Sequence, residues 1–149
     1  MSMKHPAVIG LMAGAGVILA GCGSAAPAEV PPAKVTPIAG SQVQRLQLTG
    51  QAIHRLGIVV RPVRAAPAAR GEPGGREVIP YSAVVYDTDG STWTYVNTAP
   101  RTYVREPITI VAIGDATALL SAGPPAGTAV VTVGAAELLG TEYNISGEE

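Results

Sequence analysis

The chain has 149 residues, with 10 Lys and Arg against 11 Asp and Glu, and a single cysteine, Cys22. The near-neutral charge and the lack of a basic run exclude the broad positive field that attracts nucleic acid or acidic substrates. One cysteine excludes an internal disulfide, so the fold depends on packing. The length fits one domain with at most a small appendage.

Residues 1–21 have the order of a bacterial secretory signal. A short basic start precedes the apolar run 7–19, which is too short for a spanning helix of about 20 residues. Leu19, Ala20, Gly21 and Cys22 follow, and this ending resembles a lipobox, where lipoprotein signal peptidase cuts. The resemblance implies that Cys22 is joined to membrane lipid, at the outer face of the cytoplasmic membrane or the periplasmic side of the envelope. The alternatives are an uncleaved anchor and an ordinary signal with a chance cysteine.

The next part of the chain predicts a tether and then a small structured segment. Residues 22–40 are rich in Pro, Ala and Gly without periodicity, which predicts a disordered tether. Residues 41–64 predict an order of strand, helix and strand. The first strand covers 42–48, where Leu46 and Leu48 share one face.

The helix of this segment is predicted over 51–56. Thr49 can cap its start, and Gly57 can end it in the left-handed conformation. Its buried side would carry Ala52, Ile53 and Leu56. A strand over 58–63 follows, and Pro62 restricts it to a sheet edge or a strand end. Residues 65–75 have no pattern and predict a second linker.

Residues 76–140 predict a β-domain. Strands over 77–86 and 92–97 flank 87–91, whose Asp-Gly pair is a strong hairpin signal. Further strands are predicted over 102–113, which Pro107 can break, over 117–121 and over 128–133. A helical turn over 135–139 would stop at Gly140, and the acidic tail 141–149 would fray. Short strands at this spacing favour a mainly β fold, a small antiparallel β-barrel or β-roll with one or two short helices.

Several segments carry a family resemblance. Residues 48–63 read LTGQAIHRLGIVVRPV, residues 78–87 read VIPYSAVVYD and residues 93–96 read WTYV, with further matches at 104–110 and 120–131. In this order they resemble the opening segment and the membrane-proximal domain of periplasmic adaptor proteins of efflux systems, also called membrane fusion proteins. The resemblance implies a β-domain like the membrane-proximal one and a role as an accessory subunit on an inner-membrane transporter permease.

The chain also departs from that family. The linker 65–75 stands where a full adaptor carries a lipoyl-like domain, a long helical hairpin and a β-barrel, and no heptad pattern predicts a hairpin. Bridging of the periplasm is therefore not expected. Two alternatives stay open, a free-standing envelope lipoprotein that binds a small ligand or a cell-wall component, and a decayed adaptor. The oligomeric state, the exported substrate and the transporter class are not defined by these segments.

No sequence pattern indicates catalysis, a cofactor or a metal site. Aligning Gly90 with the glycine of a calcium-binding EF-hand loop puts Val85 and Val96 at ligand positions, so 87–91 is interpreted as a hairpin turn. His54 has no second ligand at metal-binding spacing. Phosphate-loop, dinucleotide and Gly-x-Ser-x-Gly motifs are absent. We therefore expect a protein that is not an enzyme and carries no cofactor.

The large aromatic residues allow two interpretations. They are Tyr81, Tyr86, Trp93, Tyr95 and Tyr103. They can form cross-strand pairs on a half-buried sheet, which is the favoured interpretation, or an exposed patch that docks on a transporter. Strand alternation predicts that Tyr81 and Tyr86 face opposite ways and that Trp93 and Tyr95 share a face. All five are kept as candidate docking residues.

Overall fold

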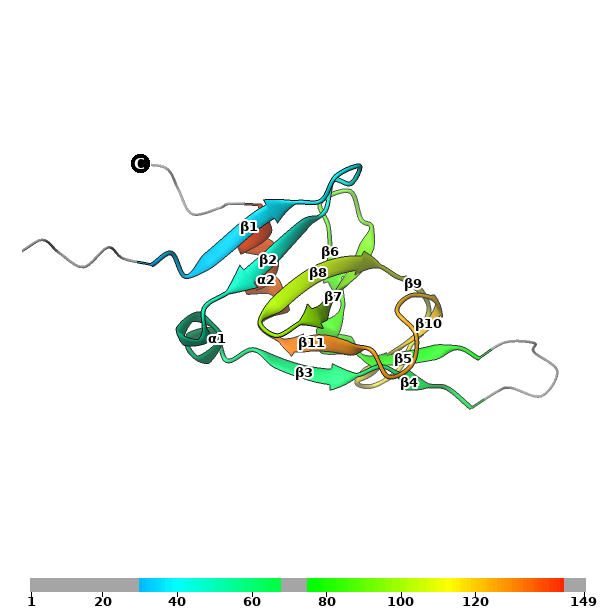
Figure 1. Ribbon diagram of the computed structural model, residues 1–149. Coiled ribbons are helices and arrows are strands. Elements are labelled where there is room, and N and C mark those ends of the chain that lie inside the picture. The colour runs from blue at the N-terminus through cyan, green and yellow to red at the C-terminus, as the bar shows by residue number, and fades with distance from the viewer. Residues whose placement is uncertain (1–29, 68–74, 144–149) are drawn as a thin grey trace, which may run out of the picture.

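The computed structural model describes residues 30–67 and 75–143, which form a mainly β fold with antiparallel sheets and two α-helices (Figure 1). The predicted signal, the lipobox residues 19–22 and residues 22–29 of the predicted tether lie outside the described residues, as do 68–74 and 144–149.

The larger sheet mixes strands from both ends of the chain. Its order is β1 (Ala33–Pro37), β2 (Gln44–Leu48), β8 (Thr102–Pro107), β7 (Thr92–Ala99), β11 (Ala129–Val133) and β3 (Val59–Pro62), and β6 (Val85–Tyr86) pairs with β7. The smaller sheet has the order β4 (Arg64–Ala65), β5 (Glu77–Pro80), β10 (Thr117–Ala122) and β9 (Thr109–Ile113). In the described residues no strand pairing closes either sheet into a barrel.

The predicted opening segment and the predicted β-domain form one unit. In the larger sheet Leu46 of β2 lies opposite Tyr103 of β8, and Val60 of β3 lies opposite Val131 of β11. Pro62 lies in β3 at the end of the strand order, the edge position that its missing N–H predicts.

Helix α1 (Gly50–Leu56) confirms the predicted helix, with its cap at Thr49 and its end at Gly57. The Thr49 side chain accepts a hydrogen bond from the Ala52 amide at 3.1 Å, which caps the first turn. Gly57 ends the helix with φ 62° and ψ 34°, a left-handed conformation that favours glycine. The buried side carries Ala52, with Ile53 and Leu56 partly buried against the core.

The tether prediction is wrong for residues 33–37, which form strand β1. Val35 lies opposite Leu46 of β2, and Ala33 and Val35 pack against the core. The composition predicted no order here, but the outer edge of β2 offers backbone partners and an apolar face to cover. Those tertiary partners outweigh a weak local preference.

The C-terminal prediction is also wrong, because helix α2 (Ala135–Glu142) passes through Gly140 and takes in the start of the predicted tail. Leu138 and Glu142 lie four residues apart on one face of the helix, and both are fully buried. Burial of this face continues the helix past a residue that alone would favour its end.

Two predicted strands are interrupted. A 3₁₀ helix over Tyr81–Ala83 divides 77–86 into β5 and β6, and Ile108 separates β8 from β9, next to the break expected at Pro107. The predicted hairpin is confirmed, since β6 pairs with β7 and Gly90 turns between them with φ 85°.

The core has two apolar clusters, one on each side of the larger sheet. The first packs this sheet against α1 and α2 and includes Leu46, Leu48, Tyr95, Val131 and Leu138. The second packs it against the smaller sheet and includes Ile79, Val96, Ala118, Leu120 and Val130. Neighbours along one strand, such as Tyr95 and Val96, point into different clusters, so the centre of the larger sheet is buried on both faces.

Candidate functional site

The five aromatic candidates do not form one surface. Tyr95 and Tyr103 are buried in the first cluster, as the favoured interpretation of a half-buried sheet expects, so they do not belong to an exposed docking patch. Trp93 is half-buried, and its indole Nε1 donates to the Ser91 hydroxyl at 2.7 Å. Only Tyr81 and Tyr86 are exposed, with fractional exposures of 40% and 49%.

Tyr81 and Tyr86 lie together on the surface, and the prediction that they face opposite ways is wrong. Their hydroxyl oxygens are 3.2 Å apart. The 3₁₀ turn at Tyr81–Ala83 breaks the strand alternation between them, which brings both rings to one side. The hydrogen bond between the hydroxyls raises the pKa of Tyr86 above its ordinary value. They form the exposed aromatic pair of the described structure.

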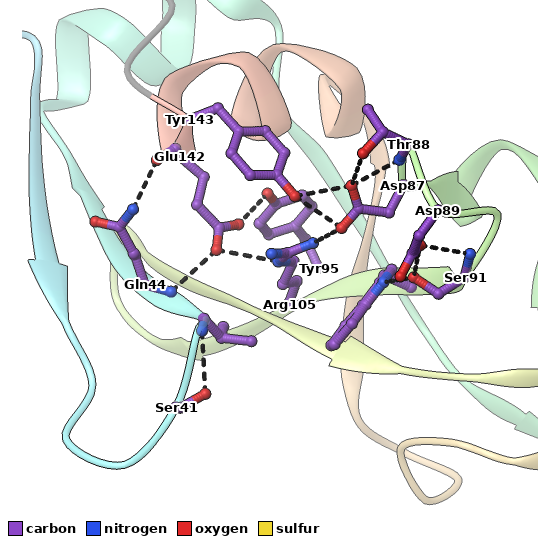
Figure 2. A network of polar contacts seen from close by, with 12 residues as sticks. Ser41, Gln44, Asp87, Thr88, Asp89, Ser91, Tyr95, Arg105, Glu142 and Tyr143 are labelled. Atoms are coloured by element: carbon purple, nitrogen blue, oxygen red, sulfur yellow. Dashed lines mark hydrogen bonds and ion pairs between the residues drawn. The ribbon is translucent and has the colours of Figure 1, made fainter.

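A polar network centred on Arg105 was not predicted (Figure 2). The Arg105 guanidinium donates from Nε to Glu142 Oε1 at 3.0 Å and from Nη1 to Asp87 Oδ2 at 2.6 Å. Its Cζ lies 4.5 Å from the centroid of the Trp93 ring and 5.3 Å from that of Tyr143, which are cation–π distances. Arg105 therefore joins β8, the 87–91 turn and the end of α2.

Glu142 is the second centre of this network. Its Oε1 also accepts from the Gln44 amide at 2.9 Å, and its Oε2 accepts from the Tyr95 hydroxyl at 2.5 Å. The Gln44 side-chain amide donates back to the Glu142 carbonyl oxygen at 2.9 Å. A carboxylate that is 1% exposed thus has charged and neutral partners from three strands.

The electrostatics of the network favour structure over acid–base chemistry. Hydrogen bonds from Tyr143 and Arg105 lower the pKa of Asp87 to about 2. Burial opposes the charge of Arg105, but its hydrogen bond to Asp87 and the charge of Glu142 more than offset this and raise its pKa. Burial and the hydrogen bond to Glu142 raise the pKa of Tyr95. These pKa values move away from neutral pH, whereas an acid–base catalyst needs a pKa near it.

No metal site is found in residues 30–67 and 75–143, where no three His, Cys, Asp or Glu side chains could hold one ion. His54 is exposed on α1. The carboxylates of the 87–91 turn are engaged within the protein, since Asp87 pairs with Arg105 and Asp89 accepts from the Ser91 amide and hydroxyl. The same described part contains no helix with the length and apolar character needed to cross a membrane.

A large apolar groove lies between α1 and α2 in the described part of the chain. It has a volume of about 830 Å³. Its lining residues are Pro31, Pro32, Ala33, Val35, Leu48, Ala52, Arg55, Leu56, Glu137, Gly140 and Thr141. We call it the α1–α2 groove. Its size is within the range of pockets that bind small molecules, about 300–1,000 Å³.

The sequence held only a partial signal for the end of α2. Ala135 and Leu138 have the spacing of one helical face, but the next position on that face is the charged Glu142, so apolar periodicity does not extend the helix past Gly140. The partners of Glu142 come from strands remote in the sequence, so no local pattern reveals them.

Comparison of this chain with protein-family models, with curated proteins and with solved structures finds no match. The likeness to adaptor proteins therefore depends on the segments quoted in the sequence analysis.

Proposed function

We propose that this chain is a non-catalytic, lipid-anchored envelope protein that acts as an adaptor-like accessory subunit on an inner-membrane efflux or export transporter. The lipobox-like residues 19–22 support the anchor. One observation supports the adaptor-like part. The adaptor-like segments 48–63 and 120–131 lie on either side of residues 65–75, yet they pair in one sheet, where β3 lies beside β11 and Val60 is opposite Val131. A single unit of this kind suits a β-roll like a membrane-proximal domain.

The exposed aromatic pair is the docking surface of this proposal. Tyrosine is enriched at binding hot spots because its large ring loses little conformational freedom on binding. Tyr81 and Tyr86 are exposed, adjacent and already held together by a hydrogen bond, so docking would order them further at low entropic cost.

The test is capture of the tagged full chain from membranes solubilised in mild detergent, with mass spectrometry of the proteins that copurify. We expect a cytoplasmic-membrane permease in the captured material. Changing Tyr81 and Tyr86 together to Ser should reduce its recovery several-fold. Changing Val111 and Ile113 to Ser, two exposed apolar residues of β9, is the matched control and should leave recovery unchanged. Clean capture without any permease contradicts the proposal.

The α1–α2 groove favours a second candidate function, a free-standing envelope lipoprotein that binds a small apolar ligand. One preparation of the captured protein can distinguish the two functions. A bound small molecule seen by native mass spectrometry, together with no permease in the capture, supports the second function and contradicts the first.

A further inference from the structure

The α1–α2 groove has the chemistry of an acyl-chain site. Its floor and walls are aliphatic side chains and prolines, with Val35 and Leu48 from the sheet and Leu56 from α1. Only one cation, Arg55, and one anion, Glu137, line it. An anionic lipid headgroup would need a cluster of cations, so the groove suits an uncharged apolar chain.

The groove is kept open by small residues. Ala52 of α1 and Gly140 of α2 line it from the two helices. A Cβ atom built at Gly140 meets nothing within 4 Å, so this position borders empty space. Glycine inside a helix is less favourable than alanine, and here the missing side chain widens the groove.

The chain enters the fold beside this groove. A smaller hollow of about 400 Å³ is lined by Val30, and it shares Pro31, Ala33 and Leu48 with the α1–α2 groove. Residues 23–29 alone separate Val30 from Cys22. A stretch of that length reaches at most about 28 Å, and a flexible one spans roughly 16 Å. The side chain of Cys22 is therefore within reach of the groove.

We propose that the α1–α2 groove holds an acyl chain of the lipid attached to Cys22. The inference depends on the lipidation of Cys22 in the proposed function. A tethered chain has an effective concentration on the order of millimolar, which favours it over a free ligand of similar affinity. Bilayer and groove are both apolar, so the free energy of moving the acyl chain from one to the other is close to zero. An acyl chain in the groove is withdrawn from the bilayer, which weakens the membrane attachment of the protein.

Photo-cross-linking in intact cells tests this proposal. Cells are fed a palmitate that carries a diazirine and an alkyne, so that the lipid on Cys22 is labelled. After irradiation, the purified full chain is digested, and the labelled peptides are identified by mass spectrometry. We expect cross-links from the Cys22 lipid to residues that line the groove, such as Leu56 on α1 and Thr141 on α2. Gly140→Leu fills the groove and should lower the yield about tenfold, since it removes the apolar contacts of the chain.

Two controls make the outcome decisive. Gln51→Leu adds the same side chain on the exposed side of α1, outside the groove lining, and should leave the yield unchanged. In Cys22→Ser, cross-links at the groove should disappear. If they persist there, a bilayer lipid fills the groove and the proposal is wrong. A labelled Cys22 without groove cross-links also overturns it but leaves the anchor intact, whereas an unlabelled Cys22 overturns the anchor as well.

Discussion

Glu142 joins helix α2 to the larger sheet through hydrogen bonds from Gln44, Tyr95 and Arg105. Glu142→Gln keeps the shape of the side chain but leaves the buried Arg105 with one anionic partner instead of two. Removing one partner of a buried ion pair is strongly destabilising, so we expect the free energy of unfolding to fall by about 3 kcal/mol. Urea denaturation measures the loss. Glu137→Gln changes an exposed acid on the same helix and should stay within about 0.5 kcal/mol of the parent protein. Equal effects of the two variants would show that the network contributes no stability.

Asp87 gives the network a defined pH dependence. Its pKa is about 2 in the folded protein, below the value of about 3.9 for an unfolded chain. A lowered pKa stabilises the fold above about pH 4, and this contribution is lost as the pH falls towards 2. Asp87→Asn should therefore lower the melting temperature at pH 7, and the melting temperatures of the two proteins should converge near pH 2. Asp115→Asn, in an exposed turn, controls for the change in net charge. A constant difference between Asp87→Asn and the parent from pH 7 to 2 would contradict this assignment.

Two buried threonines allow a matched test of hydrogen bonding. Thr94 is fully buried, and its hydroxyl finds no partner among the described residues. The hydroxyl of Thr132, also buried, donates to the Val59 carbonyl oxygen at 3.3 Å. Thr94→Val should raise the free energy of unfolding by about 1 kcal/mol, whereas Thr132→Val should lower it by about 1 kcal/mol. Thermal unfolding monitored by circular dichroism measures both, and equal signs would contradict the assignment.

The roles of residues that cap or end a helix could be predicted from the sequence, whereas the polar network around Arg105 and Glu142 could not. The cap at Thr49 and the turn at Gly57 involve atoms only a few residues apart, so their spacing is visible in the sequence. Arg105 and Glu142 are 37 positions apart, and they meet only because α2 packs across the sheet. Their identities alone indicate two ordinary surface charges.

At the scale of elements, the glycine that follows α1 and the glycine inside α2 have opposite effects on stability. Gly57 has a positive φ, so Gly57→Ala should destabilise the fold by about 1 kcal/mol. Gly140 lies inside α2 with open space around it, so Gly140→Ala should stabilise the fold by about 0.5–1 kcal/mol. Urea denaturation of the two variants should therefore give shifts of opposite sign. A loss of stability in Gly140→Ala would show that α2 is strained at this position.

The elements that departed from prediction depend on tertiary partners. Strand β1 has a composition typical of a tether, and it is ordered by pairing with β2. The last turn of α2 is ordered by the burial of Glu142, although Gly140 by itself favours the helix end. In both cases the local preference of the residues favours another conformation, but contacts with distant strands determine the structure.

At the scale of the whole molecule, the two core clusters are linked through shared strands. Strand β7 contributes Tyr95 to the first cluster and Val96 to the second, and β11 contributes Val131 and Val130 in the same way. Loss of either cluster would leave these central strands with one exposed apolar face. The predicted opening segment and the predicted β-domain are therefore not separately stable units.

This linkage predicts one cooperative unfolding transition. Leu46→Ala in the first cluster and Ile79→Ala in the second should each lower the free energy of unfolding by about 2–5 kcal/mol, since both side chains are fully buried. Urea unfolding followed by the fluorescence of Trp93 and by far-ultraviolet circular dichroism should give coincident curves in the parent and in both variants. Separate midpoints, with one substitution moving only one of them, would mean that the clusters unfold independently. Coincident curves would mean that any partner or lipid bound beside α1 and α2 stabilises the remote smaller sheet to the same extent, because both belong to one folding unit.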